Sequence, residues 1–566
     1  MGGFTLFAGV ALLTLAAPFE LTEPLVRLPR QSVTSLETAV LSAFLAWAFV
    51  VARTRRIPEW RTPLTLPWAA LVAAMLVASL ASPVSRVNAL HMTGRLAAAF
   101  GVYLLTVNGV TTRARLGAVL TLAVAAGLVV SLIALLEYLG VAPVLAWLKA
   151  FRPEVATVGA HVRAGGPLQY PTIASMYLEV VFAFGLGVLL AQIDGRRWIA
   201  VAAIFAALVV VGAGIAVTFT RAGFLTMAAS LALAGTMRVT ARGVDIGARA
   251  VAALAIVVGA LFVSSRSAQS LWLRLTTEGQ SSWYRAAIAA PPDVELPTGR
   301  MALVPVAITN TGRLAWDPAG DPPVVLSYHW LPADGDRFVS FEGARTSFAD
   351  RVEPGTTAVV NARVVAPRQP GRYRLEWDLT QEGRLWFSTE PGAVRRMSRA
   401  VVAGQSADAA ALATIAPPKP TMRPGRFELW RAAARIVAAH PFIGIGPDNF
   451  RLAYGRYAGI AMADTRTHSN NMYVEMLTGG GLLAGVAFAW LAWRAAGCVA
   501  AGLRGAVERG GTAAIGVAAA ALAIALHATV DSFLSFAPTY VLFSLTLGCA
   551  VACARGVETG LDAHRV

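Results

Sequence analysis

One short stretch of the chain brings together side chains that can carry out acid–base chemistry. The segment THSNNMYVE contains a single imidazole, that of His468. Amides, a phenol and a carboxylate follow it closely, at Asn470, Asn471, Tyr473 and Glu475. Histidine suits proton transfer near neutral pH, and the amides can orient a sugar hydroxyl or cap a helix. We interpret His468 as a catalytic or substrate-contacting residue, with a structural histidine as the alternative.

Three arginines lie where a membrane-facing site would need positive charge. Arg221 follows Thr218 and Thr220 in AVTFTRAGFLTM, Arg426 opens a predicted helix, and Arg163 lies beside glycines in HVRAGGPLQYP. Arginine binds phosphate oxygens through forked, charge-assisted hydrogen bonds, and a charge near hydrocarbon needs a partner. We predict that Arg221 and Arg426 hold a diphosphate, with Arg163 as a third candidate. Arginines that merely reach the membrane surface are the alternative.

The other polar groups indicate neither a metal site nor a nucleotide site. His527 and Asp531 lie four residues apart on one predicted helix face, where they either support a site or form a simple buried hydrogen bond. The sequence has no Asp-rich or His/Cys cluster with metal-ligand spacing, and no P-loop or dinucleotide motif. We therefore expect no metal and no cofactor, and a nucleotide-driven pump is disfavoured.

Composition places these residues in a polytopic membrane protein. Of the 566 residues, 56% are hydrophobic and only 14% are charged, against about 25% charged residues in soluble domains. The net charge is +16, but most arginines flank apolar runs, which is typical of membrane topology rather than nucleic-acid binding. The three cysteines indicate no disulfide framework. The N-terminal apolar run lacks a basic start and a cleavage site, so it is predicted to be a first span.

Twelve apolar runs are long enough to cross about 30 Å of hydrocarbon. They lie near 3–19, 35–52, 65–82, 88–107, 115–139, 171–191, 198–217, 222–237, 248–264, 474–493, 511–530 and 536–554. Every second connection between them is rich in arginine. The positive-inside rule therefore predicts that both termini are cytoplasmic and that the long connection 265–473 lies outside, in the periplasm of a bacterium.

The long external connection has a pattern of its own. Alternating apolar residues between 291 and 402 predict five or more short strands and a β-sandwich of immunoglobulin-like type. Trp316, Trp330, Trp377 and Trp386 are available for its core. The sandwich is either a glycan- or partner-binding module or a spacer, and we favour the spacer. The predicted division is membrane helices 1–9 in 1–264, a periplasmic connector in 265–290, the periplasmic sandwich in 291–402, a linker with catalytic-loop helices in 403–473, and membrane helices 10–12 in 474–566.

Several motifs around His468 resemble the signature region of the O-antigen ligase and Wzy-type polymerase superfamily. The motifs are R-x3-W from Arg426, HPFIGIGPDNF, HSNNMYVEMLTGGGLLAG and, earlier in the chain, TFTRAG. This superfamily includes lipopolysaccharide O-antigen ligases, Wzy-type polymerases and protein O-oligosaccharyltransferases. The resemblance covers the membrane scaffold and the histidine-bearing loop, and it leaves out the β-rich insert.

The resemblance implies an all-α, membrane-embedded, metal-independent glycosyltransferase of the bacterial inner membrane. Its donor would be an undecaprenyl-diphosphate-linked glycan, and its acceptor a lipid A core, a polysaccharide chain or a protein. Arg221 and Arg426 would bind the donor diphosphate, and His468 would activate the acceptor hydroxyl. Thr220 stands where the family pattern has serine, and Asn470 stands where many members have a second histidine.

Two other classes of function stay open at this point, and so does the choice between ligase and polymerase. A transporter or flippase for the same lipid-linked glycan would share the spans and the arginines but would have no need of His468. An assembly or binding protein would use the β-rich insert as its working part. Glycan transfer that depends on His468 separates the enzyme from both.

Overall fold

The protein consists of two compact units. The structure, a computed structural model, describes residues 2–28, 31–55, 57–152, 156–158, 161–264, 268–277, 280, 282–319, 322–382, 385–390, 392–404, 424–460 and 463–559. Met1–Ala156, Arg163–Ser264 and Pro424–Val566 form the first unit, which we call the membrane unit. Thr157–Val162 and Ser265–Arg423 form the second, the β unit. Most of the linker expected after 403 lies outside the described residues.

Within the described residues of the membrane unit, nine helices are long and apolar enough to cross a membrane. They are α2 (Ser35–Thr54), α4 (Arg86–Gly109), α5 (Arg113–Tyr138), α7 (Pro171–Asp194), α8 (Trp198–Val217), α9 (Arg221–Arg242), α10 (Ile246–Val263), α14 (Met472–Arg509) and α16 (Ala537–Ala554). Three shorter apolar helices, α1 (Gly2–Ala16), α3 (Thr65–Leu80) and α15 (Ala513–His527), occupy the other predicted runs. The helical, multi-pass class is confirmed, while the count of twelve spans stays a prediction.

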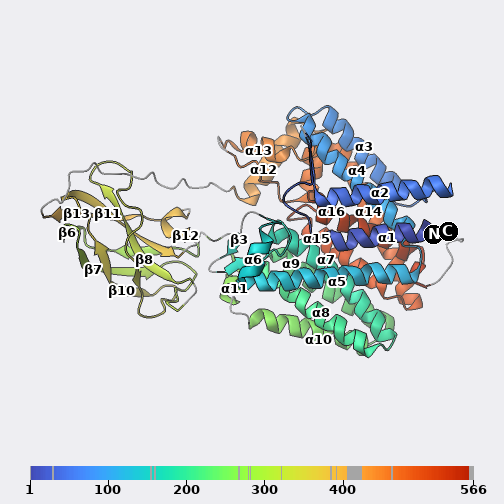
Figure 1. The fold of residues 1–566 in the computed structure, drawn as a ribbon, viewed down its shortest axis with the longest axis horizontal. Coiled ribbons are helices and arrows are strands. Elements are labelled where there is room, and N and C mark those ends of the chain that lie inside the picture. The colour runs from blue at the N-terminus through green and yellow to red at the C-terminus, as the bar shows by residue number, and fades with distance from the viewer. Residues whose placement is uncertain are drawn as a thin grey trace. The chain divides into compact units, whose positions relative to one another are not determined.

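Helix α7 is the centre of the membrane unit. Its whole apolar span is buried, and α5, α8, α9 and α15 pack around it, as the side-by-side helices in Figure 1 show. Small residues allow the closest approach, because a Cβ on Gly187 of α7 would lie only 3.0 Å from the Cα of Gly516 in α15. Glycine at such contacts lets membrane helices pack backbone to backbone.

Shorter elements complete the membrane unit and its borders. They are the helices α6 (Ala142–Leu148), α12 (Arg426–Ala439), α13 (Phe450–Ala458) and η2 (Val557–Thr559), with the hairpins β1 (Val26–Leu28)–β2 (Gln31–Val33) and β3 (Ala156–Val158)–β4 (His161–Arg163). Helix α12 is amphipathic, and Leu429, Ala432, Ala433 and Ile436 form its buried face. This face packs against α13 and α14, so α12 is fastened beside the start of α14.

Helix α14 is broken near its beginning, and a loop fills the break. Gly481 has φ +60°, a non-helical value that divides α14 into two parts. The backbone N–H groups of Ile445 and Gly446 donate to the carbonyls of Thr478 and Gly479, at 2.9 and 2.8 Å. In return, the N–H of Leu482 and of Leu483 donate to carbonyls of the same loop, those of Pro441 and Phe442. Loop 441–446 thus satisfies backbone groups that hydrocarbon would leave unpaired.

Within its described residues, the β unit contains a three-stranded antiparallel sheet, a six-stranded mixed sheet and one helix, α11 (Ala268–Thr276). The smaller sheet has the order β10 (Thr357–Val365), β7 (Met301–Asn310), β5 (Ala286–Ala289). The larger sheet has the order β6 (Asp293–Pro297), β13 (Arg396–Ala403), β11 (Gly371–Gln381), β8 (Val324–Pro332), β9 (Thr346–Ser347). The short strand β12 (Leu385–Trp386) also pairs with β11, and the 3-10 helix η1 (Phe387–Thr389) follows β12 in the chain. Only the β13–β6 pair of this sheet is parallel.

The core of the β unit lies between these sheets. Trp316, Trp330 and Trp377 are almost fully buried, and the indole N–H of Trp330 donates to the Val365 carbonyl of the smaller sheet, at 2.9 Å. Trp386 does not belong to this core. It pairs with Thr380, on the other face of the larger sheet, where its ring packs against His329. A separate sheet region is therefore confirmed, and the immunoglobulin-like type stays a prediction.

Candidate functional site

The loop that carries His468 is held from two sides. On one side, the indole N–H of Trp430 in α12 donates to the Ser469 carbonyl, at 3.0 Å. On the other side, the Ser469 N–H donates to Oε1 of Glu475 in the first turn of α14, at 2.8 Å. Ser469 is fully buried. The backbone beside His468 is therefore fixed between two helices, which gives the imidazole a defined position.

Two carboxylates flank one ring nitrogen of His468. Its Nδ1 lies 3.7 Å from Oδ1 of Asp448 and 3.9 Å from Oε1 of Glu475. The side chain is 23% exposed, and the edge of its ring approaches Phe536, with 6.2 Å between the ring centroids. Both distances exceed a hydrogen bond, and both carboxyl groups face Nδ1 rather than the other ring nitrogen. The arrangement leaves Nε2 as the nitrogen that can accept a substrate proton.

Asp448 is a site residue that we did not single out from the sequence. Its φ of +61° is unusual for a residue other than glycine. Its Oδ2 accepts from Nε of Arg451 at 2.9 Å, and its carbonyl accepts from the side-chain amide of Asn88 at 3.1 Å. Aspartate in a Gly-Pro-Asp-Asn turn was the available signal, although nothing in it indicated His468 as the neighbour.

The neighbouring residue, Asn449, fastens this turn to the loop between α3 and α4. Its buried side chain donates to the Ser82 hydroxyl and the Ser85 carbonyl, at 2.9 and 3.0 Å. Its amide oxygen accepts from Asn88 at 3.0 Å, and the Ser82 hydroxyl also donates to the Ile445 carbonyl. Every polar atom of the Asn449 side chain thus has a partner, so Asp448 projects from a rigid support.

Three residues expected to support His468 have structural tasks in addition. Asn471 caps α14 by accepting from the Val474 N–H, and it donates to the Thr529 carbonyl at 2.9 Å. The Tyr473 hydroxyl donates to the Ala525 carbonyl at 3.0 Å. Asn470 has φ +52°, a conformation that asparagine tolerates better than most residues. These contacts hold α14 against the end of α15.

Arg221 lies at the start of α9, after a turn that Arg163 binds. Nε of Arg163 donates to the Thr218 carbonyl at 3.0 Å, and one of its terminal nitrogens donates to the Thr220 hydroxyl at 3.3 Å. Burial lowers the pKa of Arg163 to about 10, so its guanidinium stays charged at neutral pH. The structure thus brings Arg163 to the turn that sets the position of Arg221.

Arg426 lies at the exposed start of α12, within electrostatic reach of groups at the end of α15. Glu428 accepts from the Gly425 N–H at 2.9 Å and so caps this helix. Burial raises the pKa of the Asp531 carboxyl, and the positive groups that oppose this rise are His527, His468 and Arg426. Arg426 and His468 therefore both interact electrostatically with the Asp531 carboxyl.

One known protein family matches the part of the chain around His468. Residues 394–489 match a family model described as O-antigen ligase. The chain carries an O-antigen ligase domain. The resemblance to the O-antigen ligase and Wzy-type superfamily is thereby confirmed, and the domain implies a glycosyltransferase-like enzyme of the ligase or polymerase type. No curated protein matches the chain.

The O-antigen ligase domain contains most of the geometry around His468. It includes α12, α13, loop 441–446 and the first part of α14, and therefore Arg426, Asp448, His468 and Glu475. Arg163 and Arg221 lie outside it, earlier in the membrane unit. Within the described residues, no group of three or more His, Cys, Asp or Glu side chains could hold a metal ion.

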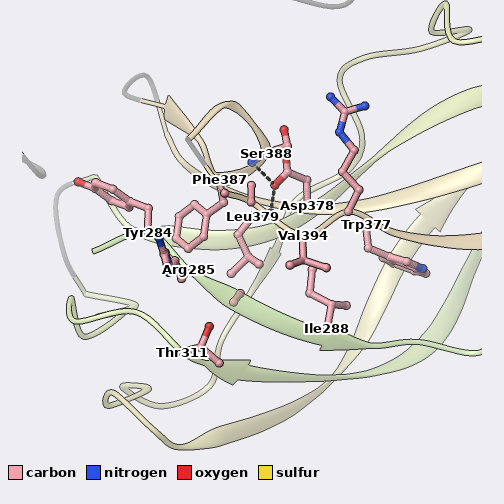
Figure 2. A pocket seen from close by; sticks show the side chains of 14 residues that line it. Tyr284, Arg285, Ile288, Thr311, Trp377, Asp378, Leu379, Phe387, Ser388 and Val394 are labelled. Atoms are coloured by element: carbon pink, nitrogen blue, oxygen red, sulfur yellow. Dashed lines mark hydrogen bonds between the residues drawn. The ribbon is translucent and has the colours of Figure 1, made fainter. Parts of the chain in front are cut away.

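The β unit has a cavity of its own, of about 230 Å³, between the edge strand β5 and the end of β11. Tyr284, Phe387, Trp377 and Asp378 are among the residues that line it (Figure 2). Oδ1 of Asp378 accepts from the N–H of Leu379 and of Ser388, at 2.8 and 3.1 Å. Its Oδ2 lies 3.1 Å from His329. Because these partners occupy the carboxylate, we assign the cavity to the packing of the β unit.

Proposed function

We propose that this protein transfers a glycan from an undecaprenyl-diphosphate donor to a hydroxyl group of its acceptor, as an O-antigen ligase or a polysaccharide polymerase. The observation that carries the proposal is the placement of His468 between Asp448 and Glu475, inside the O-antigen ligase domain. A histidine flanked by carboxylates is a general base with a defined free nitrogen. Neither a flippase nor a binding protein needs that arrangement.

The proposed reaction is a single displacement. Nε2 of His468 takes the proton of the acceptor hydroxyl as its oxygen bonds to the anomeric carbon of the donor. The bond from that carbon to the diphosphate oxygen breaks, and the diphosphate leaves with the electron pair. Asp448 and Glu475 stabilise the imidazolium that forms. A general base of this kind contributes roughly 100- to 10,000-fold to the rate.

The negative charge that develops on the diphosphate needs fixed positive partners. We assign this role to Arg221 and Arg426, whose guanidinium groups suit phosphate oxygens. Arg163 supports them through the turn 218–220, because two of its donors are used there. In this proposal the His468 end of the membrane unit faces the periplasm, both termini lie in the cytoplasm, and no metal or cofactor takes part.

Transfer by the purified protein tests the proposal. Wild type in detergent should move glycan from lipid-linked oligosaccharide to one of three supplied acceptors: lipid A core, polysaccharide or protein. His468→Ala should lower the rate by roughly 100-fold or more. His440→Ala is the matched control, because this second histidine of the domain ends α12 and, among the described residues, its imidazole has one hydrogen bond, to Tyr457 at 3.4 Å. Full activity in His468→Ala would reject the base, and wild-type movement of lipid-linked glycan without transfer would indicate a flippase.

The stereochemistry of the product gives an independent test. Attack from the side opposite the leaving diphosphate inverts the anomeric carbon. A donor of known anomeric configuration should therefore give a product of the opposite configuration, measured by NMR of the new linkage. Retention would reject the single displacement and would require a covalent glycosyl intermediate.

A further inference from the structure

A fully buried polar group joins three helices in the middle of the membrane unit. Nδ1 of His527 in α15 lies 2.8 and 2.9 Å from the two carboxylate oxygens of Glu179 in α7. The hydroxyl of Thr226 in α9 donates to the same carboxylate, at 2.6 Å. All three side chains are 0% exposed. We call Thr226, Glu179 and His527 the buried triad.

Burying the ionisable side chains of the triad costs folding free energy. Glu179 lies in α7, whose entire apolar span is buried among other helices, and ionisable groups at such depth are rare unless they serve a function. Replacing a buried ion pair by apolar residues of similar volume often leaves the stability of a protein unchanged or raises it. Nε2 of His527 also has no hydrogen-bond partner among the described residues. Stability alone therefore does not explain the triad.

On one side, the buried triad leads to the proposed diphosphate site. Thr226 lies five residues after Arg221 in α9, so its hydroxyl fixes the first turns of the helix that begins with this arginine. The same part of α9 lies close against α7, because a Cβ on Gly223 would overlap the Ser175 hydroxyl. The bond from Thr226 to Glu179 sets how α9 is rotated and shifted along this contact.

On the other side, the buried triad leads to the His468 loop. His527 ends α15, and the carbonyls around it, those of Ala525, Ala528 and Thr529, accept from Tyr473, Met472 and Asn471. These three residues begin α14, directly after His468. Asp531 and Arg426 are the other charged groups within electrostatic reach of His527. The end of α15 is thus the support on which the start of α14 rests.

We propose that the buried triad is a positioning unit that holds the Arg221 end of α9 at a fixed place relative to His468. The inference rests on the proposed function, because it assigns the donor to Arg221 and the acceptor proton to His468. None of the three residues touches the reacting atoms. Their contribution is to keep the donor diphosphate and the His468 imidazole at a fixed distance and orientation relative to each other.

The first test separates donor binding from acceptor use. Thr226→Val removes the hydroxyl and should raise the KM for the lipid-linked donor by about tenfold, which is the scale of one hydrogen bond to a charged group. The KM for the acceptor should not change, and Thr226→Ser should restore the donor KM. The matched control is Thr546→Val, since the hydroxyl of this buried threonine of α16 has one hydrogen bond within the described part of the chain, to the carbonyl of Leu542 in its own helix. Equal effects on donor and acceptor, or equal effects of both valine variants, would overturn the proposal.

A double-mutant cycle tests whether Thr226 acts through Arg221. Binding of undecaprenyl diphosphate is measured directly for wild type, Thr226→Val, Arg221→Lys and the double variant. We expect Thr226→Val to weaken binding about tenfold in the wild-type background and to have little effect once Arg221 is lysine. Additive losses would overturn the inference. If Thr226→Val lowers the folded yield, the isosteric Glu179→Gln takes its place in the same cycle. Wild type that binds the lipid but transfers no glycan would reject the proposed function and leave the cycle interpretable.

Discussion

At the scale of single residues, the candidate site has two carboxyl groups that approach His468 from different parts of the chain. Glu475 lies seven residues after the histidine, one turn into α14, and Asp448 lies twenty residues before it. Glu475 also accepts from the Ser469 N–H, so it orients the loop as well as the ring. Asp448 is bound by Arg451 on its other oxygen. Glu475 thus orients the loop that carries His468, whereas Asp448 is the second carboxylate that faces Nδ1 of the ring.

We predict that Asp448→Asn lowers kcat for glycan transfer by about 10- to 100-fold, with a smaller change in the acceptor KM. The variant keeps the shape of the side chain but removes the negative charge that stabilises the imidazolium. The matched control is Asp464→Asn, because this nearby carboxylate is half-exposed and pairs with Arg466. A kcat equal to that of the control would show that Asp448 serves only to shape the turn.

The half-buried Asp531 carboxyl should make the stability of the protein depend on pH. Because burial raises its pKa, the folded protein binds this proton more tightly than the unfolded chain, and the stability that follows is present at low pH and lost as the pH rises through the raised pKa. We predict that Asp531→Asn melts at a higher temperature than wild type at about pH 8, and that the difference shrinks toward about pH 4. A difference that is constant with pH, or a less stable variant at pH 8, would contradict this.

The residue types of the site could be predicted from the sequence, but most partners could not. An imidazole with amides and a carboxylate close by in the chain indicates His468 and Glu475 directly. Asp448 and the pairing of Glu179 with His527 join residues far apart in sequence, and only the packing of helices brings them together. Asp531 lies four residues after His527, so we considered it as a possible hydrogen-bond partner of that histidine. In the structure, the imidazole of His527 binds Glu179 instead. The left-handed φ of Asn470 was not predictable from the sequence, although asparagine tolerates it better than most residues.

At the scale of elements, the broken helix α14 and loop 441–446 form one structure. Gly481 allows the break, and a Cβ there would overlap the backbone of Phe442. Gly444 has φ +64°, and a Cβ on it would overlap the carbonyl of Thr478. Glu475 lies in the first part of α14, before the break.

We predict that Gly481→Ala destabilises the protein by about 2 kcal/mol or more, through the strained φ and the overlap with the loop, and that it lowers transfer activity at the same time. The control is Gly497→Ala in the same helix, where no atom lies near an added Cβ and alanine favours the helix. The melting temperature of each variant in detergent is the measurement. A tolerated Gly481→Ala would show that the break is not required.

Element positions were more predictable than element details. Apolar runs of sufficient length indicated each membrane helix, because hydrocarbon imposes that length on every span. The break in α14 was not predictable in the same way, since TGGGL also suits an ordinary tight helix contact. The place of Trp386 was missed because alternation assigns a face only when the strand and its partner are known.

At the scale of the whole molecule, the orientation of the chain in the membrane is the remaining prediction. Arginine-rich connections predict cytoplasmic termini and a β unit outside the cell membrane. We predict that alkaline phosphatase inserted after residue 404 is active, and that the same reporter fused to the C-terminus is inactive while a fluorescent protein there folds. The reverse pattern would invert the topology and would exclude a periplasmic site for His468.

The break in α14 also constrains how the protein is made. Until loop 441–446 docks, the carbonyls of Thr478 and Gly479 and the N–H groups of Leu482 and Leu483 have none of the partners described for them. A nascent α14 entering the bilayer alone would expose these groups to lipid. The loop precedes α14 in the chain, so it leaves the ribosome first and is at hand when the helix arrives. We therefore expect a circular permutation that places loop 441–446 after α14 to lower the yield of inserted, folded protein.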